Sequence, residues 1–351
     1  MSWVQEIARP DIVALRPYEH ASWEPGLERL HANELPWRPA DDGSRAGLNR
    51  YPEPQPRALV ERLAELYAVA PPSVLVGRGS DEAIDLLARA FCRAGRDAVL
   101  VCPPTFGMYS VSARIQGAEV LQAPLLATDG FALDEQALLE RCTAAVKLVF
   151  LCSPNNPTGN LLDEAAIVRI ARRLAGRALV VIDEAYIEFA GRASLARLVA
   201  EQPNLAILRT LSKAHGLAGA RCGALIADPE IIALLRKIIP PYAITQLTLE
   251  AVLDRLKPEP RSQSRTRLEM LLAERERLSL SLPRLARVAR VWPSAANFLL
   301  AEFEDAGAAL ARAREARLLV RDARGYPGLG RALRITVGTP EQNGRLLEAW
   351  S

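Results

Sequence analysis

The stretch KLVFLCSPNNPTGNLLDEAAIVRIARRLAGRALVVIDEAY, residues 147–186, contains the pattern from which the architecture of the chain can be predicted. Its apolar runs 147–152 and 178–182 are nearly uninterrupted, and the segment 163–174 between them has the apolar spacing of an amphipathic helix. Apolar strands joined by amphipathic helices are typical of a parallel sheet that is covered on both faces. We therefore predict two buried strands here with a helix between them.

The same alternation continues on both sides of this stretch. The predicted helices on its N-terminal side are 57–67, 80–91, 108–116 and 134–141. The predicted strands elsewhere in the alternation are 74–77, 98–102, 119–122, 205–208 and 224–227. The fold class that follows is α/β, with a large domain built on a mainly parallel seven-stranded sheet covered by helices.

The pattern changes after residue 228. Helical spacing covers 230–239, 246–256, 261–280 and 308–317, and a last helix begins at residue 340, while strands are predicted at 296–302, 318–321 and 333–337. This composition indicates a smaller α+β domain beside the large one. The domain limits that we predict are 1–50 for an N-terminal arm and part of the small domain, 51–240 for the large domain, and 241–351 for the small C-terminal domain.

Composition and charge exclude several classes of protein. The chain has 351 residues, half of them hydrophobic, and a formal charge of +3 that is spread along the sequence, so nothing indicates a nucleic-acid partner. Its five cysteines lack Cys-x-x-Cys spacing, which favours a reducing compartment. The first residues do not have the pattern of a secretory leader and no apolar run has membrane-spanning length, so we expect a cytoplasmic protein without a membrane partner. Three histidines without paired spacing make a metal site unexpected.

Polar and aromatic side chains follow the predicted strands at the ends where ligands bind in sheets of this kind. Phe106, Asn156, Asp183 and Tyr186 follow three of the strands, and Lys213 lies in a glycine-containing segment between two apolar runs. Partial burial and a neighbouring cation such as Arg221 would lower the pKa of Lys213 and make its amine nucleophilic. The alternative is an ordinary loop lysine.

A second group of residues is suited to binding an anion. The short strand 74–77 runs through a glycine turn into a helix, where Ser80 is the predicted N-cap and free backbone N–H groups face outward. Donors and charge for a phosphate are expected from Gly79, Ser80, Asp81, Thr210, Ser212 and Arg221. A purely structural helix cap is the alternative explanation of the glycine turn.

Taken together, these residues fit an aldehyde cofactor held as a Schiff base on Lys213. Asp183 is placed to hold a pyridinium N–H, Tyr186 and Asn156 to hydrogen-bond a phenolate oxygen, and Phe106 to stack on a flat ring. Each has a structural alternative: a helix cap for Asp183, a turn residue for Asn156, and core aromatics for Tyr186 and Phe106.

Several motifs resemble those of the fold-type I aminotransferases that use pyridoxal 5′-phosphate: Ser153-Pro-Asn-Asn-Pro-Thr-Gly159, Asp183-Glu-Ala-Tyr186 and Ser212-Lys-Ala-x-Gly-Leu-Ala-Gly-x-Arg221. Others are similar, more narrowly, to the histidinol-phosphate aminotransferase family: Leu30-x-Ala-Asn-Glu34, Asn49-Arg-Tyr-Pro-Glu-Pro-Gln-Pro56, Gly77-Arg-Gly-Ser-Asp-Glu82, Cys102-Pro-Pro-Thr-Phe-Gly-Met-Tyr109 and Leu333-Arg-Ile-Thr-Val-Gly-Thr339. The resemblance covers nearly the whole chain and implies the aspartate-aminotransferase-like fold.

The resemblance also implies roles for individual residues. Lys213, Asp183 and Tyr186 would be the catalytic positions, and Lys213 would carry the cofactor. The implied cofactor-binding set is Gly79, Ser80, Asp81, Phe106, Asn156, Asp183, Tyr186, Thr210, Ser212, Lys213 and Arg221, with Tyr51 contributed by the partner subunit of a homodimer. Arg334 would bind the carboxylate of glutamate, and Tyr18, Asn156 and Arg321 complete the implied substrate-binding positions.

The implied reaction is a ping-pong transamination in histidine biosynthesis that interconverts histidinol phosphate plus 2-oxoglutarate with imidazole-acetol phosphate plus glutamate. The sequence departs from the family pattern at His215, where phenylalanine is usual, at Phe106, where tyrosine is frequent, and at Pro340, where a charged residue is common. An aromatic amino-acid aminotransferase and a threonine-phosphate decarboxylase remain alternatives within the same fold. A non-catalytic sensor with an aminotransferase-like domain is the alternative from another class.

Overall fold

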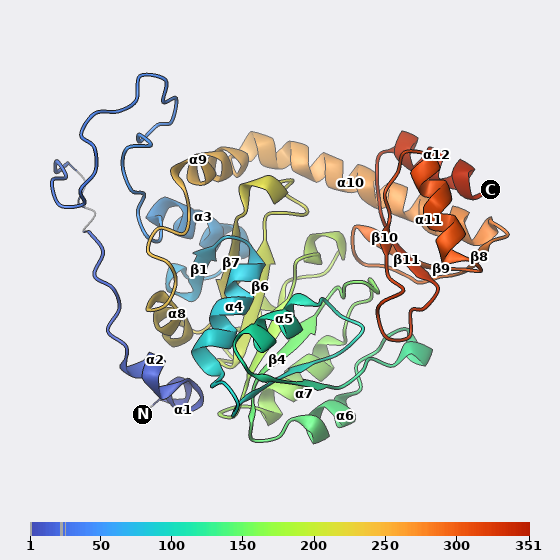
Figure 1. Cartoon of the computed structure of the whole chain (residues 1–351), viewed down its shortest axis with the longest axis horizontal. Coiled ribbons are helices and arrows are strands. Elements are labelled where there is room, and N and C mark those ends of the chain that lie inside the picture. The colour runs from blue at the N-terminus through green and yellow to red at the C-terminus, as the bar shows by residue number, and fades with distance from the viewer. Residues whose placement is uncertain (1, 22–23, 25) are drawn as a thin grey trace.

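The computed structural model describes residues 2–21, 24 and 26–351, so residues 1, 22–23 and 25 of the predicted arm lie outside the described residues. The described chain forms a large α/β part and a smaller α+β part joined by one long helix, α10 (Pro258–Ser281) (Figure 1). The predicted fold class is confirmed.

The large part is built on a seven-stranded sheet in the order β1-β7-β6-β5-β4-β2-β3. The strands in that order are β1 (Val74–Gly77), β7 (Gly223–Ile226), β6 (Leu205–Thr210), β5 (Leu179–Asp183), β4 (Val146–Cys152), β2 (Ala98–Val101) and β3 (Glu119–Gln122). The five strands from β6 to β3 are parallel, whereas β7 is antiparallel to both of its neighbours. The sheet is therefore mainly parallel, as predicted.

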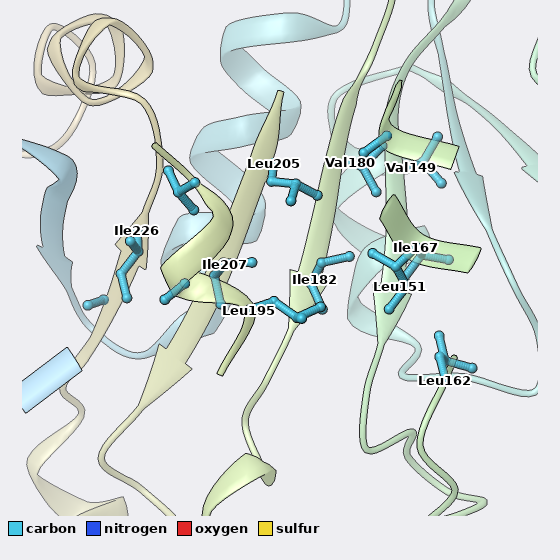
Figure 2. Packing of buried hydrophobic residues seen from close by; sticks show 14 of the residues in the cluster. Val149, Leu151, Leu162, Ile167, Val180, Ile182, Leu195, Leu205, Ile207 and Ile226 are labelled. Atoms are coloured by element: carbon cyan, nitrogen blue, oxygen red, sulfur yellow. The ribbon is translucent and has the colours of Figure 1, made fainter. Parts of the chain in front are cut away.

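Alternate side chains of the central strands enter two separate cores, which explains the nearly uninterrupted apolar runs. On β5, Val180 and Ile182 belong to one core, while Leu179 and Val181 belong to the other. Figure 2 shows the first core, in which Ile182 and Ile207 lie near Leu195. Because both faces of the sheet are covered, every residue of β5 is buried.

Different helices cover the two faces. The first core is completed by α3 (Arg57–Tyr67), α6 (Glu135–Arg141), α7 (Glu164–Arg173) and α9 (Gln246–Arg255). The second is completed by α1 (Trp3–Ile7), α4 (Ser80–Phe91), α5 (Met108–Ile115) and α8 (Pro229–Arg236). The two-sided covering leaves the strand ends as the place where polar side chains can gather.

The smaller part has a four-stranded antiparallel sheet in the order β10-β11-β9-β8. Its elements are β8 (Val288–Val291), β9 (Phe298–Phe303), α11 (Ala306–Glu315), β10 (Arg321–Asp322), β11 (Ala332–Thr336) and α12 (Pro340–Trp350). The predicted strand 318–321 overlaps β10 only at Arg321, so its bounds are wrong. Leu318 and Val320 pack against the core of this part, and backbone pairing begins only at Arg321. Strand β8 was not predicted.

The N-terminal segment has two short helices that the sequence pattern did not predict. Val4 and Ile7 of α1 belong to the second core, and α2 (Pro10–Ala14) follows directly. The described residues between α2 and α3 then run outside the body of the large part (Figure 1). Apolar side chains on that segment, among them Leu30 and Trp37, are largely exposed.

No helix among the described residues combines the length and the hydrophobicity that crossing a lipid bilayer requires. The described residues also contain no group of three His, Cys, Asp or Glu side chains that could hold a metal ion. All five cysteines are free and buried.

Candidate active site

A cavity of about 300 Å³ lies at the carboxyl ends of β4, β5 and β6, with the smaller part on its other side. The predicted site residues that line it are Gly79, Ser80, Asp81, Phe106, Asn156, Asp183, Tyr186, Thr210, Ser212, Lys213, Arg221, Arg321 and Arg334. Gly79 and Arg334, which are 255 positions apart in the sequence, thus line the same cavity. Only Tyr18 and Tyr51 of the predicted set are not among the lining residues.

Asp183, the last residue of β5, carries a buried carboxyl group into this cavity. Its Oδ2 accepts a hydrogen bond of 2.7 Å from the Tyr109 hydroxyl, and its Oδ1 accepts one of 3.0 Å from the backbone N–H of Ala185. Burial raises the pKa of Asp183, while these two hydrogen bonds oppose the rise. Because both donors are neutral, the carboxylate can still pair with a cationic group in the cavity.

Lys213 lies in the loop between β6 and β7, as predicted, and its Nζ is 5.7 Å from the centre of the Tyr186 ring. Burial lowers the pKa of Lys213 most, and the charge of Arg334 lowers it further. Asp81 and Asp183 act in the opposite direction. Arg221, the cation that we expected to lower this pKa, does so less than Arg334. The direction favours an uncharged, nucleophilic amine.

The start of α4 forms the anion-binding end of the cavity. The predicted N-cap at Ser80 is wrong: Gly79 is the N-cap, with φ of +88°, and Ser80 is the first helical residue. Since glycine has no side chain, the first N–H groups of this helix have no side-chain cap. A Cβ atom on Gly79 would lie 2.9 Å from Nη2 of Arg221, so only glycine lets the backbone pass the guanidinium at this distance.

The side chains around this helix start are hydrogen-bond donors, apart from the Asp81 carboxylate. Arg221 Nη2 donates to Asp81 Oδ2 at 3.2 Å, and its Nη1 lies 3.5 Å from Ser212 Oγ. The Thr210 hydroxyl donates to Ser212 Oγ at 3.0 Å. Two hydroxyl groups, a guanidinium and a helix N-terminus together form a site suited to a phosphate.

The opposite side of the cavity brings Asn156 and Arg334 together. Arg334 Nη1 donates to Asn156 Oδ1, and its Cζ lies 5.2 Å from the centre of the Phe298 ring. The Nε of Arg334 is buried and has no hydrogen-bond partner among the described residues. Arg321 is the backbone partner of Arg334 across β10 and β11, and both residues line the cavity, so the smaller part contributes two arginines to it. This side of the cavity is suited to anionic groups of a substrate.

The structure places two predicted residues away from the cavity. Tyr18 is 72% exposed on the N-terminal segment. Tyr51 is 49% exposed, and its ring stacks on Tyr242 with 4.5 Å between centroids. Neither residue lines the cavity.

Four lining or supporting residues were not singled out from the sequence. Tyr109 holds Asp183, while Cys152 and Tyr326 line the cavity. Asn155 joins two of the strand-end loops, since it accepts from Thr105 and donates to the backbone oxygen of Pro104. The position of Tyr109 in the first turn of α5, directly after a strand end, is the signal that could have indicated it.

Comparisons with known proteins identify the family of this chain. Residues 32–349 match the family model for aminotransferase class I and II. A histidinol-phosphate aminotransferase from Stenotrophomonas maltophilia is 50% identical over 353 residues, which cover 99% of this chain and 96% of that protein.

Two solved structures are similar in fold. The histidinol-phosphate aminotransferase from Clostridium acetobutylicum is 22% identical with a TM-score of 0.79, covering 86% of this chain and 90% of that one. The histidinol-phosphate aminotransferase from Sinorhizobium meliloti, solved in complex with pyridoxal-5'-phosphate, is 25% identical with a TM-score of 0.78, covering 86% and 82%. The present chain belongs to the histidinol-phosphate aminotransferase family, within the class I and II aminotransferases.

Proposed function

We propose that this chain binds pyridoxal 5′-phosphate in the cavity and transfers an amino group between histidinol phosphate and 2-oxoglutarate. The observation that carries the proposal is the presence, in one cavity, of a buried carboxyl on Asp183, a lysine with a lowered pKa and an anion-binding helix start. Each end of the cavity matches one part of the cofactor. The family membership points to the same cofactor and reaction.

The phosphate of the cofactor fits the end formed by α4. The Ser80 and Asp81 N–H groups, the Thr210 and Ser212 hydroxyls and the Arg221 guanidinium would hold it there. The close passage of Gly79 past Arg221 supports this assignment, because any larger residue would displace the guanidinium. A phosphate at this position satisfies donors that otherwise face the cavity.

The ring of the cofactor fits between Asp183, Tyr186 and Phe106. The carboxylate of Asp183 would hold a proton on the ring nitrogen, since an ion pair with a neighbouring cation favours both charged forms. Tyr186 and Asn156 would hydrogen-bond the ring oxygen, and Phe106 would cover one face of the ring. When bound, the cofactor withdraws electrons from the bonds at the α-carbon of the substrate.

Lys213 has two tasks in this reaction. Its uncharged amine would bind the cofactor aldehyde in the resting enzyme, which the lowered pKa favours. Once the substrate amine has taken that place, the free Nζ would accept the proton from the substrate α-carbon as a general base. It would then donate the same proton, as a general acid, to the carbon that was the aldehyde carbon of the cofactor. The centre of the Tyr186 ring lies 5.7 Å from Nζ, so this ring limits the positions that the lysine side chain can adopt.

The substrates would be bound at the side of the cavity to which the smaller part contributes. Arg334 would bind the α-carboxylate of glutamate through its planar guanidinium, and its unpartnered Nε supports this role. Arg321 would bind the phosphate of the imidazole substrate. Tyr18, which lies outside the cavity of its own subunit, could reach that phosphate only in the site of a partner subunit.

The homodimer is part of the proposal. The segment between α2 and α3 exposes Leu30, Leu35, Trp37 and Tyr51 to solvent in one subunit, and apolar side chains of this size are typical of subunit contacts. Tyr51 of each subunit would then contact the cofactor phosphate in the other. The domain limits 1–50, 51–240 and 241–351 and a cytoplasmic location are proposed with it.

A substrate panel tests the proposal. Purified protein that has been checked for bound cofactor is assayed with histidinol phosphate, phenylalanine and threonine phosphate under the same conditions. We expect transamination of histidinol phosphate with the highest kcat/KM. Faster transamination of phenylalanine, or release of carbon dioxide from threonine phosphate, would contradict the assignment in favour of the two related activities.

A further inference from the structure

His215 belongs to a buried charged group next to the catalytic loop. This group, which we call the Glu188 cluster, consists of Glu184, Glu188, Arg209 and His215. All four side chains are at most 18% exposed. None of them lines the cavity described above, so the transamination chemistry does not use them directly.

Glu188 is the centre of this cluster. Its Oε1 accepts a hydrogen bond of 2.7 Å from Arg209 Nη2 and lies 3.7 Å from His215 Nε2. Burial by itself raises the pKa of Glu188, but the contacts with His215 and Arg209 outweigh it, so the pKa lies below its ordinary value. Oε1 of Glu188 thus has a hydrogen bond from a guanidinium and a longer contact with an imidazole.

The other charged groups of this cluster contact one another as well as Glu188. Arg209 Nη1 lies 3.7 Å from Glu184 Oε2, and its guanidinium lies 4.4 Å from the centre of the Tyr67 ring. Glu184 also accepts hydrogen bonds from the Ser194 hydroxyl and the Leu195 N–H. Arg209 is thus shared between two carboxylates and does not neutralise Glu188 alone. The imidazole of His215 supplies a second polar contact to Glu188.

The two partners stand on the two segments that carry the catalytic groups. Glu188 is in η3 (Ile187–Phe189), two residues after Tyr186 and five after Asp183. His215 is two residues after Lys213, and its backbone oxygen accepts a hydrogen bond of 3.2 Å from Arg255 of α9. A contact between the two side chains therefore joins the loop after β6 to the segment after β5.

We propose that His215 is a positioning residue. Through its contact with Glu188 it keeps the loop that carries Lys213 at a fixed position relative to Asp183 and Tyr186. The inference rests on the proposed function, because it takes Lys213 as the reacting amine. Phenylalanine at position 215 could not make this contact with a carboxylate.

The experiment compares His215→Phe, Glu188→Gln and the double variant with the wild-type holoenzyme. Two quantities are measured: kcat for the glutamate half-reaction, and the pH midpoint of the visible absorbance, which reports the protonation state at Lys213. His215→Gln serves as a second variant, whose side-chain amide keeps a polar N–H group that can contact Glu188. Glu269→Gln, which alters an exposed ion pair with Arg265 on α10, is the matched control.

A positioning role and a simple charge effect give different results. His215→Phe removes a group that can be cationic and Glu188→Gln removes an anion, so a through-space effect would move the absorbance midpoint in opposite directions. Positioning predicts that both move it in the same direction, that each lowers kcat by about tenfold with a smaller change in KM, and that the double variant is no worse than either single one. His215→Gln should recover most of the lost kcat.

Three results would overturn the inference. The first is an unchanged midpoint and kcat in His215→Phe, the second is opposite shifts in the two single variants, and the third is additive losses in the double variant. These results would leave the proposed function intact, because the wild-type protein would still have its visible band and its turnover. A wild-type protein without a visible band in the presence of pyridoxal 5′-phosphate would overturn the proposed function and this inference with it.

Discussion

The hydroxyl of Tyr109 donates a 2.7 Å hydrogen bond to Oδ2 of Asp183, although the two residues are 74 positions apart in the chain. The Tyr109 ring is fully buried and stacks on Phe150 of β4, with 4.8 Å between centroids and an angle of 5° between ring planes. This packing leaves the hydroxyl little freedom. The carboxylate that would pair with the cofactor ring is thus held by an aromatic side chain behind it.

Replacing Tyr109 tests this support. In Tyr109→Phe the ring and its stacking remain, but Asp183 loses one of the two hydrogen bonds that oppose the effect of burial on its pKa. The pKa of Asp183 should rise further, so the carboxylate is protonated at a higher pH and the acid limb of the pH–rate profile moves to higher pH. We expect kcat to fall by about tenfold at neutral pH, in line with the loss of one hydrogen bond to a charged group. An acid limb at the wild-type position would contradict this role.

Arg334 affects the pKa of Lys213. Its charge lowers the pKa of Lys213 more than any other neighbouring charge does. Arg334→Gln should therefore raise this pKa, reduce the fraction of uncharged amine at neutral pH, and move the pH dependence of cofactor recombination with the cofactor-free protein to higher pH. Arg334→Lys keeps the charge and should leave that dependence in place. Both variants should raise KM for glutamate by at least about tenfold, because the planar guanidinium is lost.

Both the backbone conformation at position 79 and the neighbouring Arg221 side chain favour glycine there. Gly79→Ala puts a Cβ atom at φ of +88° and 2.9 Å from Arg221 Nη2. We expect the free energy of unfolding to fall by about 1–3 kcal/mol and the affinity for pyridoxal 5′-phosphate to fall with it. Gly344→Ala in α12, where an added Cβ has no neighbour within 4 Å, should instead raise the free energy of unfolding by roughly 0.5–1 kcal/mol. Thermal melts and cofactor titration of the two variants check this, and unchanged cofactor affinity in Gly79→Ala would count against the phosphate assignment.

The parts of the fold that could be predicted from the sequence are those in which local pattern and burial agree. The run ending at Ile182 is apolar on both faces because both faces of β5 are covered, so the strand and the position of Asp183 at its end followed from the pattern. Lys213 could be placed between β6 and β7 for the same reason. Parallel strands bring their carboxyl ends to one edge, which is why most of the predicted site residues meet in one cavity.

What could not be predicted depends on contacts between distant segments. The hydrogen bond from Tyr109 to Asp183 requires the order of the strands, which no local pattern contains. Leu318 and Val320 have strand-like alternation, but they pack against the core of the small part without backbone pairing. Ser80 has the residue type of an N-cap, yet the close approach of Arg221 makes Gly79 take that position. The contact of His215 with Glu188 likewise joins two segments that no local pattern brings together.

Mixing two inactive variants tests whether the site is shared between subunits. Lys213→Ala lacks the reacting amine, and Tyr51→Ala lacks the side chain that we expect to reach the partner's site. If subunits exchange freely in a homodimer, the mixture should regain up to about a quarter of wild-type activity, because half of the dimers are mixed and each of these has one intact site. Activity that stays at the sum of the two separate variants after subunit exchange would contradict a shared site.

The most direct test of the account is the reaction of Lys213→Ala with histidinol phosphate. Wild-type protein loaded with pyridoxal 5′-phosphate should have a visible absorbance band that changes when histidinol phosphate is added, and it should transfer the amino group to 2-oxoglutarate with multiple turnovers. Lys213→Ala should bind the cofactor without forming that band and should show no steady-state transamination, while its far-ultraviolet circular dichroism matches the wild type. Continued turnover of histidinol phosphate by Lys213→Ala would contradict the central assignment.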